Sequence, residues 1–67
     1  MNGTRRANIS IGARVLIVEK QNQRRGETTE GYVARILTSK PVHSRGIKVK
    51  LETGEVGRVQ EVLPEED

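Results

Sequence analysis

The sequence predicts an all-β protein, a small barrel of about five short antiparallel strands. Its apolar residues fall in short runs of strand length that are separated by polar stretches and glycines. Valine, isoleucine and leucine make up most of these residues, and β-branched side chains favour strands over helices. No segment repeats apolar residues at the spacing of three and four that a stable helix needs. A barrel closed on itself is expected because it leaves the fewest strand edges exposed.

The chain is long enough for one domain with a thin core. It has 67 residues, of which 33% are hydrophobic, and Tyr32 is its only aromatic residue. A chain of this length cannot divide its apolar residues between two cores. It has no cysteine and no zinc-ligand spacing, so neither disulfides nor a metal supplement the core. We therefore expect modest stability and no cofactor.

The two ends of the chain are expected to lie outside the barrel. Residues 1–8 are polar, contain Arg5 and Arg6 and show no periodicity, which predicts a flexible basic arm. The barrel domain is predicted to span residues 9–63. Residues 64–67, which begin with a proline, form an acidic tail. Both ends are expected to be dispensable for folding, because neither carries enough apolar surface to pack.

The first two strands are predicted on either side of a long polar loop. Residues 14–19 form an apolar run of strand length, and residues 20–27 contain no apolar side chain. The second strand spans residues 29–37 and contains Gly31. A glycine inside a strand indicates a bulge or a close backbone approach, which a small coiled sheet needs. A second polar loop, residues 38–45, follows.

A β-hairpin is the most regular feature of the chain. Residues 47–52 alternate apolar and charged side chains, as in a strand that buries one face. Gly54 tolerates a positive φ in the turn, so residues 55–59 can return antiparallel. Gly57 repeats the signal for a bulge or close approach. Residues 60–63 are predicted to form a last short strand that closes the barrel.

Positive charge is concentrated in the body of the chain. The formal net charge is +3, but residues 1–50 hold eleven basic and three acidic side chains. Residues 51–67 hold one basic and six acidic side chains. The folded body is therefore more cationic than the total charge implies, which suggests a polyanionic partner.

The first two strands and the glycines around them carry a family resemblance. Residues 12–17, Gly26 and residues 31–36 resemble the KOW motif of SH3-like barrels found in ribosomal proteins and transcription elongation factors. The loop between the two halves is longer than usual in that motif. The resemblance implies an SH3-like, KOW-type barrel that binds RNA or a ribonucleoprotein.

A second resemblance covers almost the whole chain. The matching residues are Ile47 to Leu51, Gly54 and Val56 to Gln60, together with Asn8-Ile9, Gly12, Lys20-Gln21, Gln23, Thr29 to Gly31 and Ile36 to Thr38. These are similar to the YwbE-like family of small uncharacterised proteins. The resemblance supports a single domain and implies no activity.

Catalysis is not expected from this set of residues. His43 is the only histidine, and no serine has an evident base with an orienting partner. Ser44 directly follows His43, but adjacent residues in an extended chain point in opposite directions. The glycines are dispersed and precede no helix, so they form no phosphate-binding loop. Peptide grooves and methyl-lysine cages need several aromatic residues.

The chain shows no sign of export or membrane insertion. Its N-terminus lacks the apolar segment of a secretory signal, and no run is long enough to span a bilayer. We expect a cytoplasmic monomer without membrane contact.

Basic side chains from both loops and from the hairpin are expected to converge on one phosphate-binding face. Arginine and lysine bind phosphate oxygens with little regard to base sequence, and aromatic rings and arginine planes supply stacking surfaces. The predicted nucleic-acid-binding residues are Lys20, Arg24, Arg25, Lys40, His43, Arg45, Lys48, Lys50 and Tyr32.

The predicted function is non-enzymatic binding of RNA or a ribonucleoprotein through phosphate contacts. The alternative is a protein-interaction module that uses a barrel edge or an apolar surface, with basic residues that only maintain solubility. Phosphate-driven binding weakens steeply with salt, whereas an apolar interface is nearly indifferent to it. Salt dependence therefore separates the two functions.

Overall fold

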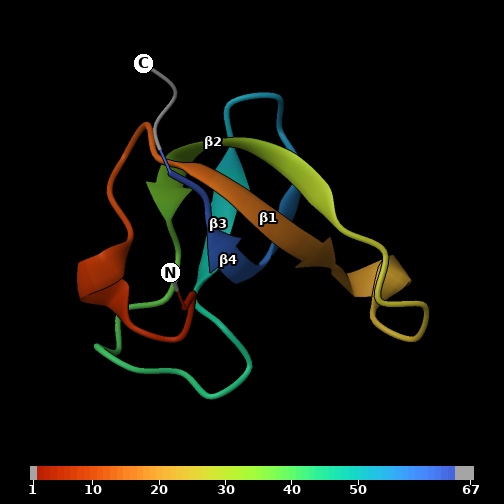
Figure 1. The fold of residues 1–67 in the computed structure, drawn as a ribbon, viewed down its shortest axis with the longest axis horizontal. Helices are drawn as coiled ribbons and strands as arrows, with labels where there is room; N and C mark the ends of the chain where they lie inside the picture. The colour runs from red at the N-terminus through yellow and green to blue at the C-terminus, as the bar shows by residue number, and fades with distance from the viewer. Residues whose placement is uncertain (1, 65–67) are drawn as a thin grey trace.

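A computed structural model describes residues 2–64 of the chain (Figure 1). Four antiparallel strands form a closed barrel in the order β1-β2-β3-β4, with β4 pairing back onto β1. The strands are β1 (Arg14–Glu19), β2 (Thr29–Ile36), β3 (Lys48–Leu51) and β4 (Val56–Val62). The predicted small all-β barrel is therefore confirmed, with four strands in place of about five.

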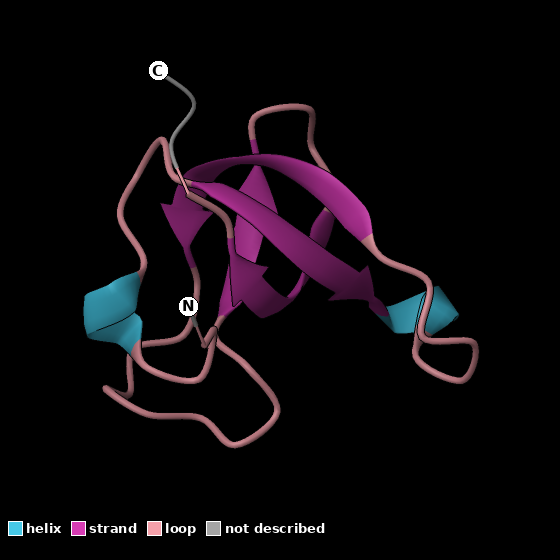
Figure 2. Ribbon diagram, viewed as in Figure 1, coloured by secondary structure: helices cyan, strands magenta, loops and turns pink. Residues whose placement is uncertain are grey.

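The helical content of the described residues is limited to two single 3-10 turns. These are η1 (Arg6–Asn8) and η2 (Lys20–Asn22), and Figure 2 shows them on opposite sides of the barrel. Within residues 2–64, no helix is long and apolar enough to cross a membrane.

The strand count differs from the prediction because of one bulge. Residues 55–63 are predicted as two strands but contribute a single one, β4. The β1–β4 ladder pairs consecutive residues of β1 with Val59 and with Glu61, so Gln60 is an extra residue in β4. A β-bulge shifts the inward and outward alternation by one residue. The sequence pattern is therefore interrupted at Gln60 although the strand continues.

The core is a single cluster of aliphatic side chains on the inner faces of the strands. In β3, Val49 and Leu51 are buried while Lys48 and Lys50 are exposed, as the alternation predicts. Each strand contributes at least one fully buried residue, and the segments before β1 and β3 add two more. The buried core residues are Ile9, Val15, Ile17, Val33, Ile47, Val49, Leu51 and Val59.

The predicted hairpin is formed by β3 and β4. Gly54 adopts a φ of +102° in the turn, a conformation that favours glycine. Its N–H donates to the Leu51 carbonyl oxygen at 2.9 Å, and the Leu51 N–H donates to the Glu55 carbonyl oxygen at 2.8 Å. The turn thus sets the register that places Lys48 opposite Arg58.

The two strand glycines mark close approaches. A Cβ atom on Gly57 would lie 2.5 Å from the Val18 carbonyl oxygen of β1. A Cβ atom on Gly31 would lie 2.6 Å from Leu51 Cδ1. The bulges of the sheet lie elsewhere, at Gln60 and in the middle of β2. The predicted close backbone approach therefore applies at Gly57, whereas the close neighbour of Gly31 is a side chain.

Residues 2–8 lie against the barrel, which differs from the free basic arm that the sequence predicts. The Gly3 carbonyl oxygen accepts a hydrogen bond from the Ile47 N–H at 2.8 Å, and the carbonyl oxygen after it accepts one from the His43 N–H at 2.9 Å. The Arg6 N–H donates to the loop before β3 at 2.8 Å. We call residues 2–8 the N-terminal strap. Backbone hydrogen bonds hold it, and these leave no trace in the side-chain pattern.

The sequence predicts an acidic tail of residues 64–67 at the opposite end of the chain. Pro64 is exposed and follows β4, and its carbonyl oxygen accepts a hydrogen bond from Arg14 at 3.1 Å. Residues 65–67 lie outside the described residues.

Deleting the N-terminal strap is expected to destabilise the barrel. The deletion would leave the N–H of Ile47, a fully buried residue, without its acceptor, which costs about 2 kcal/mol. For a domain of this size that corresponds to a fall in melting temperature of about 10 °C, measurable by circular dichroism. Arg5→Ala is the matched control, because it removes a charge and keeps the backbone bonds. Equal melting temperatures for the deletion and the intact chain would contradict a structural role for the strap.

Candidate nucleic-acid interface

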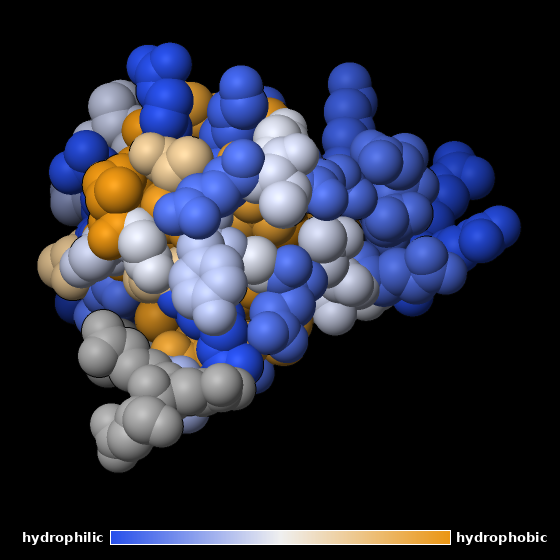
Figure 3. Space-filling model, turned by 90° about the horizontal axis from the view of Figure 1, so that it is seen from above, coloured by the Kyte–Doolittle hydropathy of each residue, from blue (hydrophilic) through white to orange (hydrophobic). Residues whose placement is uncertain are grey.

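Two adjoining hollows lie on the outside of the barrel, where the loop after β1 meets β4 and the segment before β3. Both are lined by Val18, Gln23, Arg45 and Arg58. The wider hollow, about 640 Å³, is also lined by Lys20 and Lys48, and the narrower one measures about 320 Å³. We call the two hollows together the basic groove. The end of the molecule formed by η2 and the loop after it is hydrophilic throughout the view in Figure 3.

Arg58 is the central cation of the basic groove. It lies on β4 opposite Lys48 of β3 and Val18 of β1, so three strands meet around it. Its neighbours Gly57 and Val59 are buried, so alternation directs Arg58 to the outer surface. One of its guanidinium N–H groups donates to the Gly46 carbonyl oxygen at 3.1 Å. This bond holds the guanidinium beside the chain that enters β3.

The outer face of β3 carries two like-charged cross-strand pairs. Lys48 lies opposite Arg58, and Lys50 lies opposite Arg35 of β2. Among residues 2–64, none of these four side chains makes an ion pair. Like charges directly opposite each other destabilise a sheet. A bound anion would remove that repulsion.

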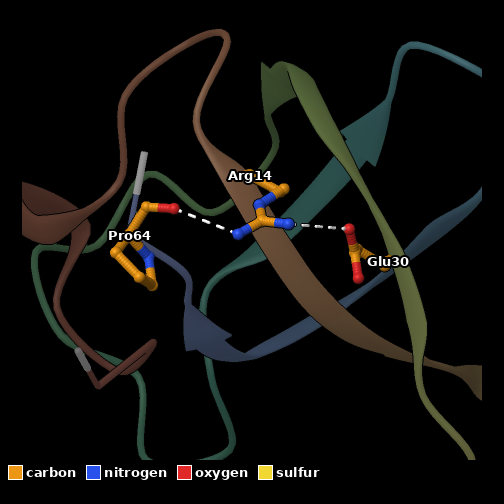
Figure 4. Close-up of polar contacts among 3 residues, drawn as sticks. All are labelled: Arg14, Glu30 and Pro64. Carbon is orange, nitrogen blue, oxygen red and sulfur yellow. Dashed lines mark hydrogen bonds and ion pairs between the residues drawn. The ribbon is translucent and has the colours of Figure 1, made fainter. Parts of the chain in front are cut away.

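The β1–β2 side of the barrel shows the opposite arrangement. Arg14 forms an ion pair with Glu30 at 3.2 Å, and it donates a second bond to Pro64 (Figure 4). The cation on this side is thus neutralised within the fold and joins β1, β2 and the chain after β4. Among residues 2–64, Arg14 is therefore unlike the four cations on the outer face of β3 and its neighbours, which make no ion pair.

His43 lies in the loop that leads to β3, close to several cations. Its Nδ1 accepts a hydrogen bond from the Arg45 N–H at 3.2 Å, so a neutral ring carries its proton on Nε2. Partial desolvation, followed by the positive charges of Arg58, Lys40 and Arg45, lowers the pKa of His43 below its usual value of 6.5. The ring is therefore neutral at pH 7.

The structure brings together only part of the predicted binding set. Lys20, Arg45 and Lys48 line the basic groove. The charges of Arg45 and Arg58 act on His43, and so does that of Lys40, which lines neither hollow. Lys50 is exposed on the same face of β3.

Three predicted residues lie away from the basic groove. Arg24 and Arg25 belong to the projecting loop after η2 and do not line either hollow. Arg25 is 3.8 Å from the Glu27 carboxylate, and its side chain is 77% exposed. Tyr32 is half-exposed on β2, opposite Arg14. None of these three residues lines the groove, although Gln23 and Gly26, which flank Arg24 and Arg25 in the chain, line the narrower hollow.

Sequence reasoning missed Arg58, Gln23 and Gln60. The signal for Arg58 was present, because the hairpin register places it directly opposite Lys48. Gln23 and Gln60 carried no signal, since their positions depend on the path of a long loop and on a bulge.

Two carboxylates limit where an anion can bind. Glu19 and Glu55 line the wider hollow near the β3–β4 turn. A hydrogen bond from the Thr53 hydroxyl, and then one from its own backbone N–H, lower the pKa of Glu55, so it is ionised at pH 7. A phosphate is therefore expected at the other end of this hollow, near Arg45, Lys48 and Arg58. Within residues 2–64, no three potential metal ligands gather to hold a metal ion.

The sequence comparison identifies the family. Residues 2–62 match the family model described as "Uncharacterized conserved protein (DUF2196)". The chain belongs to this family. The matched residues contain all four strands and every residue that lines the basic groove. The family fold thus includes the candidate interface.

A curated relative supports the same assignment. The chain is 48% identical over 63 residues to "Uncharacterized protein YwbE" of Bacillus subtilis (strain 168), which covers 94% of this chain and 97% of the relative. The predicted similarity to a YwbE-like family is therefore confirmed, and neither description assigns an activity. No solved structure matches the chain. The KOW and SH3-like resemblance stays a prediction, although a closed barrel is present.

Proposed function

We propose that this member of the DUF2196 family binds RNA in the cytoplasm, without catalysis, through phosphate contacts in the basic groove. The observation that carries the proposal is the group of cations in the basic groove that have no ion-pair partner among residues 2–64. Arg58 lies opposite Lys48, Arg45 lines the same groove, and none of the three has an ion-pair partner within residues 2–64. Phosphate oxygens are the natural ligands of such clusters.

The alternative, a protein-interaction module, has one observation in its favour. Ile11 is 63% exposed beside a separate hollow of about 300 Å³, which Ala13, Val62 and Leu63 also line. An apolar partner would bind there, on a different part of the barrel from the basic groove. The two functions therefore predict different binding surfaces.

Amide NMR shifts during a titration with a short single-stranded RNA at low salt test the proposal. Resonances of Lys20, Arg45, Lys48 and Arg58 are expected to shift most, because they line the groove. Absence of shifts, or shifts confined to the surroundings of Ile11, would refute binding at this site.

RNA affinity is expected to rise as the pH falls from 7 to 5.5. In the free protein, desolvation and neighbouring cations lower the pKa of His43. A phosphate bound beside these cations offsets their charge and raises that pKa, so protonation and binding favour each other. Affinity measured by fluorescence anisotropy should show this gain, and His43→Gln should remove it. A pH-independent affinity in the wild-type chain would place the phosphate away from His43.

A further inference from the structure

The narrower hollow of the basic groove differs in chemistry from the wider one. Its lining residues are the half-buried Val18, Gly26, two glutamines, Gln23 and Gln60, and two arginines, Arg45 and Arg58. Both carboxylates of the groove line only the wider hollow. The narrower hollow therefore offers neutral hydrogen-bonding groups, planar cations and an apolar contact, whereas the wider one is dominated by charge.

The bulge in β4 fixes the position of Gln60. Bulges re-aim side chains next to binding sites, and Gln60 is the extra residue of this one. Its Nε2 donates to the Arg58 carbonyl oxygen at 3.2 Å and to the Arg45 carbonyl oxygen at 3.5 Å. A flipped amide would point Oε1 at two other oxygens, so this orientation is the favourable one. Oε1 is then the end that can accept a hydrogen bond from a ligand.

The two arginines complete a set of groups that suits a heterocycle. The Arg58 guanidinium is held by its bond to Gly46 and retains further N–H groups. Guanidinium planes stack on nucleobases and donate to their ring nitrogens and carbonyl oxygens, while an amide oxygen accepts from their N–H groups. A phosphate alone would use only the cations and would leave the Gln60 Oε1 and the Gln23 amide without a ligand contact.

We propose that the narrower hollow binds one unstacked nucleobase, so that the chain prefers single-stranded RNA to duplex RNA. This inference rests on the proposed RNA binding and specifies its ligand. A hollow of about 320 Å³ suits a small planar ring system. The neighbouring cations Arg45 and Lys48 hold the adjacent phosphate in the wider hollow. In a duplex, stacked and paired bases cannot enter such a hollow, so only the phosphate contacts remain.

Three probes of equal length test the proposal by fluorescence anisotropy at low salt: a ten-nucleotide single-stranded RNA, an abasic oligomer with the same ribose-phosphate backbone, and a ten-base-pair RNA duplex. The single strand is expected to bind about tenfold more tightly than the abasic oligomer, near the low end of the value for a base stacked on an aromatic ring, because arginine planes take the place of the ring here. It is also expected to bind more tightly than the duplex. Equal affinities for the single strand and the abasic oligomer, or tighter binding of the duplex, would overturn the proposal.

Single-residue variants test whether the tighter binding of RNA that carries bases comes from the narrower hollow. Gln23→Ala and Gln60→Ala should each lower affinity for the single strand several-fold and leave the abasic oligomer unchanged. Asn22→Ala is the matched control, because it also removes a side-chain amide and Asn22 lines neither hollow. Amide NMR spectra verify that each variant is folded, and Gln23 lies in an exposed loop where truncation is tolerated. If neither glutamine variant changes the preference for bases, the base does not bind in this hollow.

The same titrations separate this inference from the proposed function. Binding of the abasic oligomer with no gain from bases refutes the nucleobase site and leaves the phosphate site in place. Failure of all three probes to bind at low salt refutes both.

Discussion

Replacing Val49 with aspartate is expected to leave the chain unfolded. Val49 is fully buried on β3, opposite Gly57 of β4 and Ile36 of β2. An unpaired carboxylate at this position has no partner in an entirely aliphatic core, and its burial costs several kcal/mol. A domain of this length has a total stability of roughly 3–10 kcal/mol, so the loss is comparable to the whole. An amide NMR spectrum with the narrow dispersion of an unfolded chain is the expected result.

Val42→Asp is the control for this substitution. It makes the same chemical change at a valine that is 54% exposed in the loop before β3. Its melting temperature should stay close to that of the wild-type chain. A native-like spectrum for Val49→Asp would show that the inner face of β3 is assigned to the wrong residues.

Reversing the charges of Arg45 and Lys48 together is expected to lower RNA affinity roughly 100-fold at low salt, because two charge-assisted phosphate contacts are lost. Both side chains line the basic groove and are exposed, so folding should be unaffected. The loss should be similar for all RNA sequences, since phosphate contacts carry little sequence information. Fluorescence anisotropy with the Arg45→Glu/Lys48→Glu variant measures this loss of RNA affinity directly.

The matched control is Arg24→Glu/Arg25→Glu, which changes the net charge by the same amount on the projecting loop. These arginines lie outside both hollows, and Arg25 faces Glu27. This variant should lower RNA affinity by less than about threefold, because it changes only long-range electrostatic attraction. Equal losses for the two double variants would mean that net charge, and not the groove, governs binding.

The fold could be predicted because its main determinants are local. Alternation from Ile47 to Leu51, the glycine in the turn and the polar loops all act within a few residues. The exact strand count required knowledge of the bulge at Gln60, which looks in sequence like a strand end.

The N-terminal strap could not be predicted for a different reason. Its contacts are backbone hydrogen bonds to residues some forty positions away, such as that between Gly3 and Ile47. Side-chain patterning reports burial of apolar groups and is silent about such bonds. A polar segment with two arginines therefore resembles a free arm even where it is held.

The candidate site was only partly predictable. The two exposed lysines of β3 follow from alternation, and Arg58 follows from the hairpin register. Which loop cations join them depends on loop paths that no short-range rule fixes. This is why Arg45 lies in the basic groove while Arg24 and Arg25 lie outside it.

The most direct test of phosphate binding in the basic groove is the salt dependence of RNA affinity. With about three or four phosphate contacts, a plot of log affinity against log salt concentration should have a slope of roughly −2 to −3 for a single strand. The slope for Arg45→Glu/Lys48→Glu should be smaller in magnitude by about 1.4, which is two contacts fewer. A slope near zero in the wild-type chain, or an unchanged slope in the double variant, would contradict phosphate binding in the groove.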